Sequence, residues 1–213
     1  MPRVHSAYNR FAGKSVKRLA ALSDGIFAVS MTLLVLDLHV PDALKVVTEG
    51  AFISALKELL PRLIIYLMSF LTLGIFWIGN QSLLDRIERS NRHFAWLNLA
   101  TLILVTLIPF STSLLATFIT FRFALLVYWC NLSAFGVTVL ATWLYAWKAG
   151  LTKLATDHAF HRAFTLRVCS AQAFYAGAVL LCFVTNTYVS IGLIVLIQLN
   201  YVFAPKLLFR RRR

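Results

Sequence analysis

The chain has 213 residues, of which 60% are hydrophobic, and it carries a net charge of +13 and a mean hydropathy of +0.76. Soluble domains are roughly 45–50% apolar, so this composition excludes an ordinary soluble protein and indicates a polytopic membrane protein. The basic residues fall in short segments between apolar runs and not on one face of a domain, so the charge does not indicate a nucleic-acid partner.

Apolar runs long enough to cross a bilayer follow one another along the chain and predict an all-α fold. We expect a single transmembrane domain over residues 1–213, with six helices at about residues 18–39, 53–82, 93–118, 122–147, 163–184 and 188–208. The first run is too long for the apolar core of a signal peptide, so we expect it to remain as the first span. The cysteines lie inside the apolar runs, where free and buried thiols are expected: Cys130, Cys169 and Cys182.

Basic residues are distributed unevenly between the two sides that these spans define. Most of the 21 Lys and Arg fall in residues 1–18, 85–92, 148–167 and 206–213, which an even number of spans places on one side. The other side receives only Lys45, Lys57, Arg62 and Arg122. Because segments rich in Lys and Arg remain in the cytoplasm, we expect a multi-pass protein of the cell membrane with both termini cytoplasmic.

The first span carries a polar pair at its head and a smooth apolar strip along one side. At about 100° per residue, a helix places Asp24 and Ser23 away from this strip. If several copies met at an axis, the strip would line a narrow hydrophobic pore, although ordinary helix packing would explain the same pattern. The residues of the strip, about 100° wide on such a helix, are Gly25, Val29, Thr32, Leu33 and Leu36.

Charged side chains in the first span need partners on other helices. Carboxylates are expensive in lipid, so Asp24 is a candidate functional residue. Arg18 lies six positions before it and cannot pair with it along one helix face, although an interfacial anchor would also explain this arginine. At the other end of the span, Asp37 is either part of a cation-attracting mouth or an interfacial carboxylate without a role.

Several motifs in the first half of the chain resemble one known family. The block RLAALSD, with Arg18, Leu22, Ser23 and Asp24, is similar to the RxxxFSD signature of the TMEM175 family of potassium channels. The stretch GIFWI at residues 74–78 resembles the end of that family's second helix. The third helix is matched by Asn98-Leu99 and by LIPFST at residues 107–112. The second half agrees only in the number of spans and the character of the loops.

The resemblance implies a homotetramer of six-span subunits whose first helices surround a central pore without a TVGYG filter. It places the aliphatic constriction and an adjacent hydroxyl ring on Val29, Thr32, Leu33 and Leu36. It also implies a hydrogen-bonded network that joins the first helix to its neighbours, through Arg18, Ser23, Asp24, Trp77 and Asn80. Two positions depart from the family pattern: Leu22 replaces an aromatic residue, and Asn80 and Gln81 stand where a histidine is usual.

These observations predict a potassium-permeable cation channel that acts on K⁺ and other monovalent cations in a lipid bilayer. The alternatives are a secondary transporter or a proton-conducting membrane protein, or a scaffold that conducts nothing. The sequence contains no inverted repeat and few charges at mid-span, which disfavours a transporter. No nucleophile–base pair or phosphate loop is evident, and His158 with His161 lacks a third ligand. We therefore expect no enzyme activity, no cofactor and no metal beyond permeant K⁺.

Overall fold

The computed structural model describes residues 15–41, 47–153 and 158–203, which are helical apart from short connections and one isolated bridge between Ile87 and Thr152. The last residues of the predicted sixth span, 204–208, and both termini lie outside this part of the chain. The elements are α2 (Val16–Leu33), the 3-10 helix η1 (Leu34–Asp37), α3 (Glu49–Leu84), α4 (Arg92–Thr117), α5 (Arg122–Lys148), α6 (His158–Leu180), the 3-10 helix η2 (Leu181–Phe183) and α7 (Thr187–Phe203).

Helices α2, α3 and α4 each begin at a polar residue that satisfies a free backbone N–H of the first turn, as Asn186 also does for Val189 at the start of α7. Ser15 accepts a hydrogen bond from the amide of Arg18 at 3.3 Å, and Thr48 accepts one from Ala51 at 3.2 Å. Asn91 accepts one from Phe94 at 2.9 Å. At its C-terminal end, α5 is followed by Gly150, whose φ of 64° turns the chain out of the helix.

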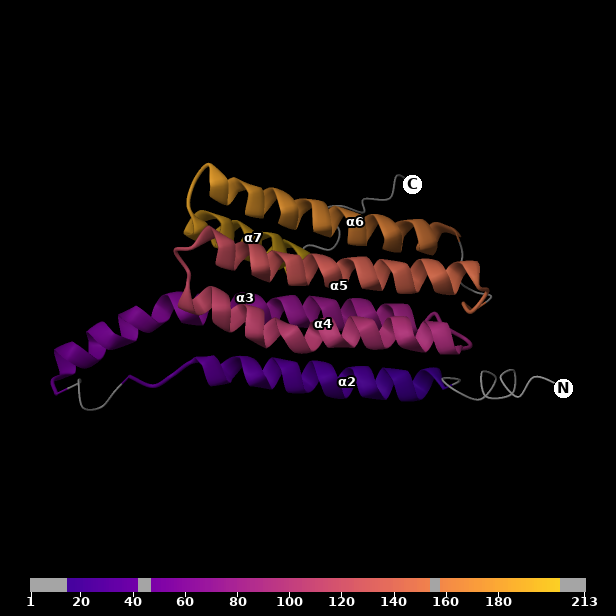
Figure 1. Cartoon of the computed structure of the whole chain (residues 1–213), viewed down its shortest axis with the longest axis horizontal. Helices are drawn as coiled ribbons and strands as arrows, with labels where there is room; N and C mark the ends of the chain where they lie inside the picture. The colour runs from indigo at the N-terminus through magenta and orange to yellow at the C-terminus, as the bar shows by residue number, and fades with distance from the viewer. Residues whose placement is uncertain (1–14, 42–46, 154–157, 204–213) are drawn as a thin grey trace.

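Within the described residues, five helical segments are long and apolar enough to cross a membrane, and the apolar helix Thr187–Val202 is shorter. The helices form an antiparallel bundle, in which the connections between successive helices alternate between its two ends (Figure 1). The longest, α3, has 36 residues and spans about 54 Å, well beyond a hydrocarbon core of about 30 Å. Its first turns, before Pro61, project past the rest of the bundle (Figure 1).

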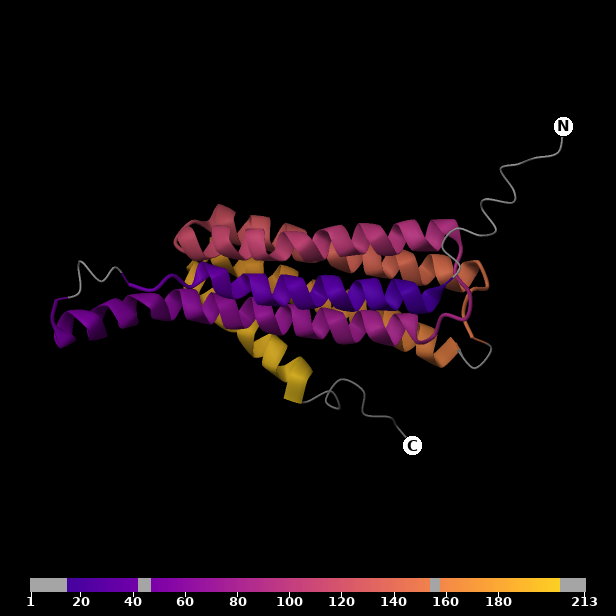
Figure 2. The same cartoon turned by 90° about the horizontal axis from the view of Figure 1, so that it is seen from below.

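The first helix lies at the edge of the bundle. It packs mainly against α3 and α4, and Figure 2 shows it running between these two. Further in, α5 packs on α4 and α6, while α7 packs on α3 and α6. Consequently one side of α2 rests on the subunit and the other is left uncovered by the described chain.

A polar cluster lies within the apolar core and joins four helices. Thr112 of α4 donates to Ser69 of α3 at 2.9 Å, and Ser69 donates to the Tyr128 hydroxyl of α5 at 3.3 Å. Gln198 of α7 donates to Thr72 of α3 at 2.6 Å. Because unpaired polar groups are costly at membrane depth, these bonds fix how α3, α4, α5 and α7 fit together.

The cysteines differ from the expectation of buried thiols. All three are free, but only Cys182 is buried, whereas Cys130 and Cys169 are exposed on the single chain. The expectation failed because an apolar position in a membrane helix can face lipid as readily as protein, and composition alone does not distinguish the two.

Candidate functional site

The uncovered side of α2 contains the apolar strip identified from the sequence. The exposed fraction is 57% for Val29, 44% for Leu33 and 68% for Leu36. The opposite side of the same helix is buried at Ser23, Phe27 and Ser30. The subunit therefore leaves a continuous apolar surface on α2 without covering it.

The geometry of this strip changes at its outer end. The sequence predicts one α-helix through residue 39, but the α-helix ends at Leu33 and continues as η1. Side chains at positions i and i+3 eclipse one another in a 3-10 helix, so Leu36 lies above Leu33 more directly than an α-helix would place it. Thr32 donates its hydroxyl hydrogen to the Val29 carbonyl at 2.8 Å, which leaves its oxygen lone pairs free to accept.

Beside the strip, Asp24 joins α2 to α3. Its Oδ1 accepts a hydrogen bond from Trp77 Nε1 at 2.7 Å and another from Gln81 Nε2. Trp77 and Gln81 are four residues apart, so both donors extend from the same face of α3. The carboxylate is exposed on the single chain and lies on the flank of α2 that faces α3.

On the other flank, Ser23 joins α2 to α4. Its hydroxyl donates to the Leu19 carbonyl at 2.9 Å and accepts from Asn98 Nδ2 at 3.4 Å. Both Ser23 and Asn98 are buried, with exposed fractions of 0% and 1%. With Asp24 held by α3 and Ser23 held by α4, the rotation of α2 about its own axis is fixed. The uncovered strip therefore has a defined direction.

Two residues that the resemblance placed in this network lie apart from it. Asn80 is buried on a neighbouring face of α3, and its Nδ2 has no hydrogen-bond partner among the described residues. The difference is one of helical phase, since Gln81 follows Trp77 by four residues and Asn80 by only three. The Arg18 side chain is exposed and makes no hydrogen bond to Ser23 or Asp24 in the described structure.

Two members of the network were not assigned to it from the sequence, Gln81 and Asn98. The spacing of four residues from Trp77 is the signal that would have favoured Gln81 over Asn80. For Asn98 the sequence offered only its place in a motif of the third helix. Its pairing with Ser23 depends on how α2 and α4 cross, which the sequence does not specify.

The outer end of the strip is attached to α4. Ser113 donates to Asp37 Oδ1 at 2.7 Å, and the His39 ring nitrogen lies 3.1 Å from the Asp37 carbonyl. This carboxylate therefore anchors η1, and an additional role at an ion entrance remains a prediction. Elsewhere in the described ranges, no group of three or more His, Cys, Asp and Glu is placed to hold a metal ion.

Comparison with known proteins identifies the family. A model of the family described as the endosomal/lysosomal potassium channel TMEM175 matches residues 18–109. A potassium channel of Streptomyces collinus is 31% identical over 173 residues, which cover 79% of this chain and 82% of that protein. A potassium channel of Chamaesiphon minutus is 36% identical over 102 residues, 48% of this chain and 50% of that protein, so the match spans about half of its length.

Vertebrate proteins and a solved structure extend this similarity. The endosomal/lysosomal proton channel TMEM175 of Bos taurus is 37% identical over 100 residues, which are 45% of this chain and 21% of that protein. The crystal structure of a lysosomal potassium-selective channel TMEM175 homolog from Chamaesiphon minutus superposes with a TM-score of 0.76 at 29% identity, covering 88% of this chain and 96% of that one. This chain belongs to the TMEM175 family of membrane channels.

Proposed function

We propose that this protein is a potassium-permeable cation channel whose pore is lined by the uncovered strip of α2 from four identical subunits. The observation that carries the proposal is the combination of an exposed apolar strip with an exposed carboxylate, Asp24, on the flank of the same helix that faces α3. The potassium channels of Streptomyces collinus and Chamaesiphon minutus support the choice of ion. The tetramer follows from the resemblance to the family.

The position of Asp24 argues that this side of α2 does not face lipid. Asp24 lies eight positions after the start of α2, and translocon-based scales set an upper value of about 2.5–3.5 kcal/mol, that of an aspartate at the centre of a membrane helix, for its cost in lipid. Trp77 and Gln81 both donate to the same oxygen of this carboxylate, Oδ1. Contact with a second copy or with water would reduce this cost, whereas acyl chains would not. The uncovered surface is therefore better suited to a subunit interface and an axial water path.

Within such a pore, conduction would depend on apolar rings. Four copies of Val29, Leu33 and Leu36 would form successive constrictions that a cation passes only after losing part of its hydration shell. The Thr32 oxygen, which keeps its acceptor capacity, would partly replace that water. Selection between K⁺ and Na⁺ would then arise from the difference in dehydration cost and would be modest, because no ring of carbonyl oxygens takes part.

The charge distribution supports an orientation for this channel. Arg86, Arg89 and Arg92 lie in or beside the connection between α3 and α4, at the same end of the bundle as the start of α2 (Figure 1). The connection between α5 and α6, with Lys148 and Lys153, meets the same end. We place this end in the cytoplasm, in accordance with the positive-inside rule.

Bi-ionic reversal potentials of the purified protein in planar bilayers test the function. With K⁺ on one side and Na⁺ on the other, the proposal expects a non-saturating current whose reversal potential indicates preference for K⁺. The mass of the detergent-solubilised particle, corrected for detergent, should equal four chains of 24.0 kDa. A flux that saturates with substrate, or the absence of any ion flux from an intact tetramer, would contradict the channel.

Proton permeation is a second candidate, because the vertebrate relatives are named proton channels. A continuous water path through the same strip would carry protons as well as K⁺. The two functions are separated by imposing a pH gradient with equal K⁺ on both sides. A reversal potential that follows the proton gradient under these conditions would favour proton permeation, and one that stays near zero would favour K⁺.

A further inference from the structure

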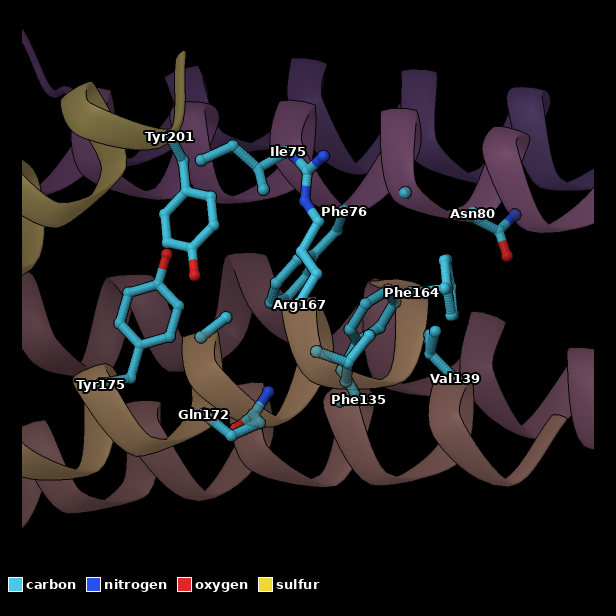
Figure 3. A pocket seen from close by; sticks show the side chains of 14 residues that line it. Ile75, Phe76, Asn80, Phe135, Val139, Phe164, Arg167, Gln172, Tyr175 and Tyr201 are labelled. Atoms are coloured by element: carbon cyan, nitrogen blue, oxygen red, sulfur yellow. The ribbon is translucent and has the colours of Figure 1, made fainter. Parts of the chain in front are cut away.

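A cleft on the far side of the subunit from the α2 strip lies between α3 and α6, with α5 as its floor. It consists of two adjoining cavities of about 80 and 240 Å³ that share Gly79, Phe164 and Arg167. Figure 3 shows the smaller cavity, with Asn80 and Phe76 on the α3 side and Arg167 on the α6 side. The cleft is separate from the proposed pore, because neither cavity is lined by a residue of α2.

The walls of the cleft are apolar and suit an acyl chain. Phe76 and Phe135 stack with ring centroids 4.0 Å apart and form one wall. At Gly136 there is no free space for a side chain, because a Cβ at this position would collide with the Gln172 side chain. Gly79 differs, since a Cβ built there has no neighbour within 4 Å and would point into open space. The cleft is therefore hollow beside Gly79 in particular.

Two polar groups at the cleft are hydrogen-bond donors that lack a protein acceptor. Asn80 is 3% exposed, lines the smaller cavity, and its Nδ2 has no partner among the described residues. Arg167 carries its guanidinium over the Tyr201 ring, 5.8 Å from the centroid. No Asp or Glu lines either cavity in the described part of the chain. Asn80 is thus a buried donor without an acceptor, and Arg167 adds an exposed cation to the same cleft, so together they suit an anionic acceptor.

The depth of Arg167 favours a lipid over a soluble anion. This residue lies nine positions into α6, which is about 13 Å along the helix axis. An arginine at this depth can extend its side chain toward the headgroup layer while its stem stays among apolar groups. The same end of the bundle is rich in Lys and Arg, which attract anionic lipids.

We propose that the cleft between α3 and α6 is a binding site for an anionic lipid. The headgroup lies beside Gly79 and Phe164 and contacts Asn80 and Arg167, and the start of one acyl chain lies deeper in the bundle, along Ile75 and Ala171. Both cavities together are too small for a complete phospholipid, so the remaining chain lies on the outer surface of the bundle. The lipid would join α3 to α6 from the side opposite the pore, and its binding is independent of whether the pore conducts.

Native mass spectrometry of the purified full-length protein tests the site. Protein freed of lipid in a neutral detergent is titrated with dioleoyl phosphatidylglycerol, with dioleoyl phosphatidylcholine and with inorganic phosphate. The proposal expects at least one phosphatidylglycerol adduct per chain at a concentration where phosphatidylcholine gives few and phosphate gives none. Equal retention of both lipids, or phosphate binding as strong as that of the lipid, would overturn the proposal. An oleate titration then shows whether a carboxylate headgroup suffices.

Two pairs of variants locate the adduct. Arg167→Gln should weaken phosphatidylglycerol binding about fivefold, the value of one basic residue near a membrane surface, while Arg162→Gln on the same helix should not. Gly79→Leu should fill the cleft and abolish the adduct, while Gly177→Leu, where a Cβ also meets nothing within 4 Å, should retain it. Intact folding is verified by the particle mass. Unchanged binding in a folded Gly79→Leu protein would contradict the site.

Discussion

The first half of the subunit, α2 to α4, and the second half, α5 to α7, differ in what fixes their structure. In the first half, specific polar side chains set the position of one helix: Asp24 against Trp77 and Ser23 against Asn98. In the second half, Tyr128 and Gln198 bond to α3, but beside the cleft α5 and α6 meet through aromatic rings, such as Trp143 with Phe164 at 5.2 Å. The family model matches residues 18–109 and so covers the first half. Polar pairs constrain residue type, whereas apolar packing constrains mainly volume, which agrees with the match of the family model to the first half.

The largest expected effect is the loss of the proposed tetramer when Asp24 is replaced by alanine. The variant removes an acceptor from Trp77 and Gln81 in every subunit, and hydrogen bonds to charged groups contribute about 1.5–3 kcal/mol each. Since the loss is repeated in every subunit, we expect most Asp24→Ala protein to elute from a size-exclusion column at an apparent mass below that of the tetramer. Glu58→Ala, on the projecting part of α3, is the control and should remain assembled. An intact Asp24→Ala tetramer would show that this carboxylate does not position α2.

A several-fold increase in conductance is expected for Leu33→Ala and Leu36→Ala. Each variant removes the bulk of one ring in the proposed pore, so ions keep more of their hydration shell and the K⁺ to Na⁺ permeability ratio moves toward one. Leu166→Ala removes a leucine of α6 whose exposed fraction, 52%, lies between those of Leu33 and Leu36, and it should leave both quantities unchanged. Single-channel recording measures the three variants. If Leu166→Ala and Leu33→Ala changed the conductance equally, the assignment of the pore to α2 in the first half would be contradicted.

A smaller effect is expected for Thr32→Val, which keeps the shape of the side chain but removes its hydroxyl. The strip then lacks its one oxygen acceptor, so we expect K⁺ conductance to fall about two- to fivefold, with little change in assembly. Thr106→Val is a matched control, because Thr106 also donates to the carbonyl three residues before it, at 2.7 Å. A current through Thr32→Val that equals the wild-type current would place this residue outside the conduction path.

The smallest expected effect concerns the junction of α2 with α4. Ser23→Ala leaves Asn98 Nδ2 without its acceptor, at a cost of about 1–3 kcal/mol if no water replaces the hydroxyl. We expect the midpoint of thermal unfolding to fall by a few degrees, as followed by tryptophan fluorescence. Ser30→Ala, another buried serine of α2, is the comparison and should shift the midpoint less. If Ser30→Ala lowered the unfolding midpoint more than Ser23→Ala, the contact between α2 and α4 would depend mainly on a different part of α2.

The sequence could predict the helical fold and the direction of α2 because both follow from periodicity. Helix length and apolar character are local properties, and the separation of Ser23 and Asp24 from Val29 follows from the helical repeat. The end of α2 at Leu33 was not predicted, because the apolar run continues through the 3-10 helix. In this case composition gives no signal for a change from 3.6 to 3.0 residues per turn.

Contacts between distant segments could be predicted only where the family resemblance supplied them. It placed Trp77 and Asn80 in one network with Asp24 and left Gln81 out, because two adjacent amides both suit a polar network. The cleft near Arg167 could not be predicted, since it depends on how far apart α3 and α6 lie. Its two donors come from segments 87 positions apart and carry no shared motif.

Modification of a cysteine placed on the α2 strip tests the central claim most directly. In a background of Cys130→Ser and Cys169→Ser, Leu36→Cys would be treated with a positively charged thiol reagent while the K⁺ current is recorded. The proposed pore predicts that the current is abolished, whereas Leu166→Cys on α6 can be labelled without loss of current. A K⁺ current that persists at full strength after complete labelling of residue 36 would show that ions take another path through the protein.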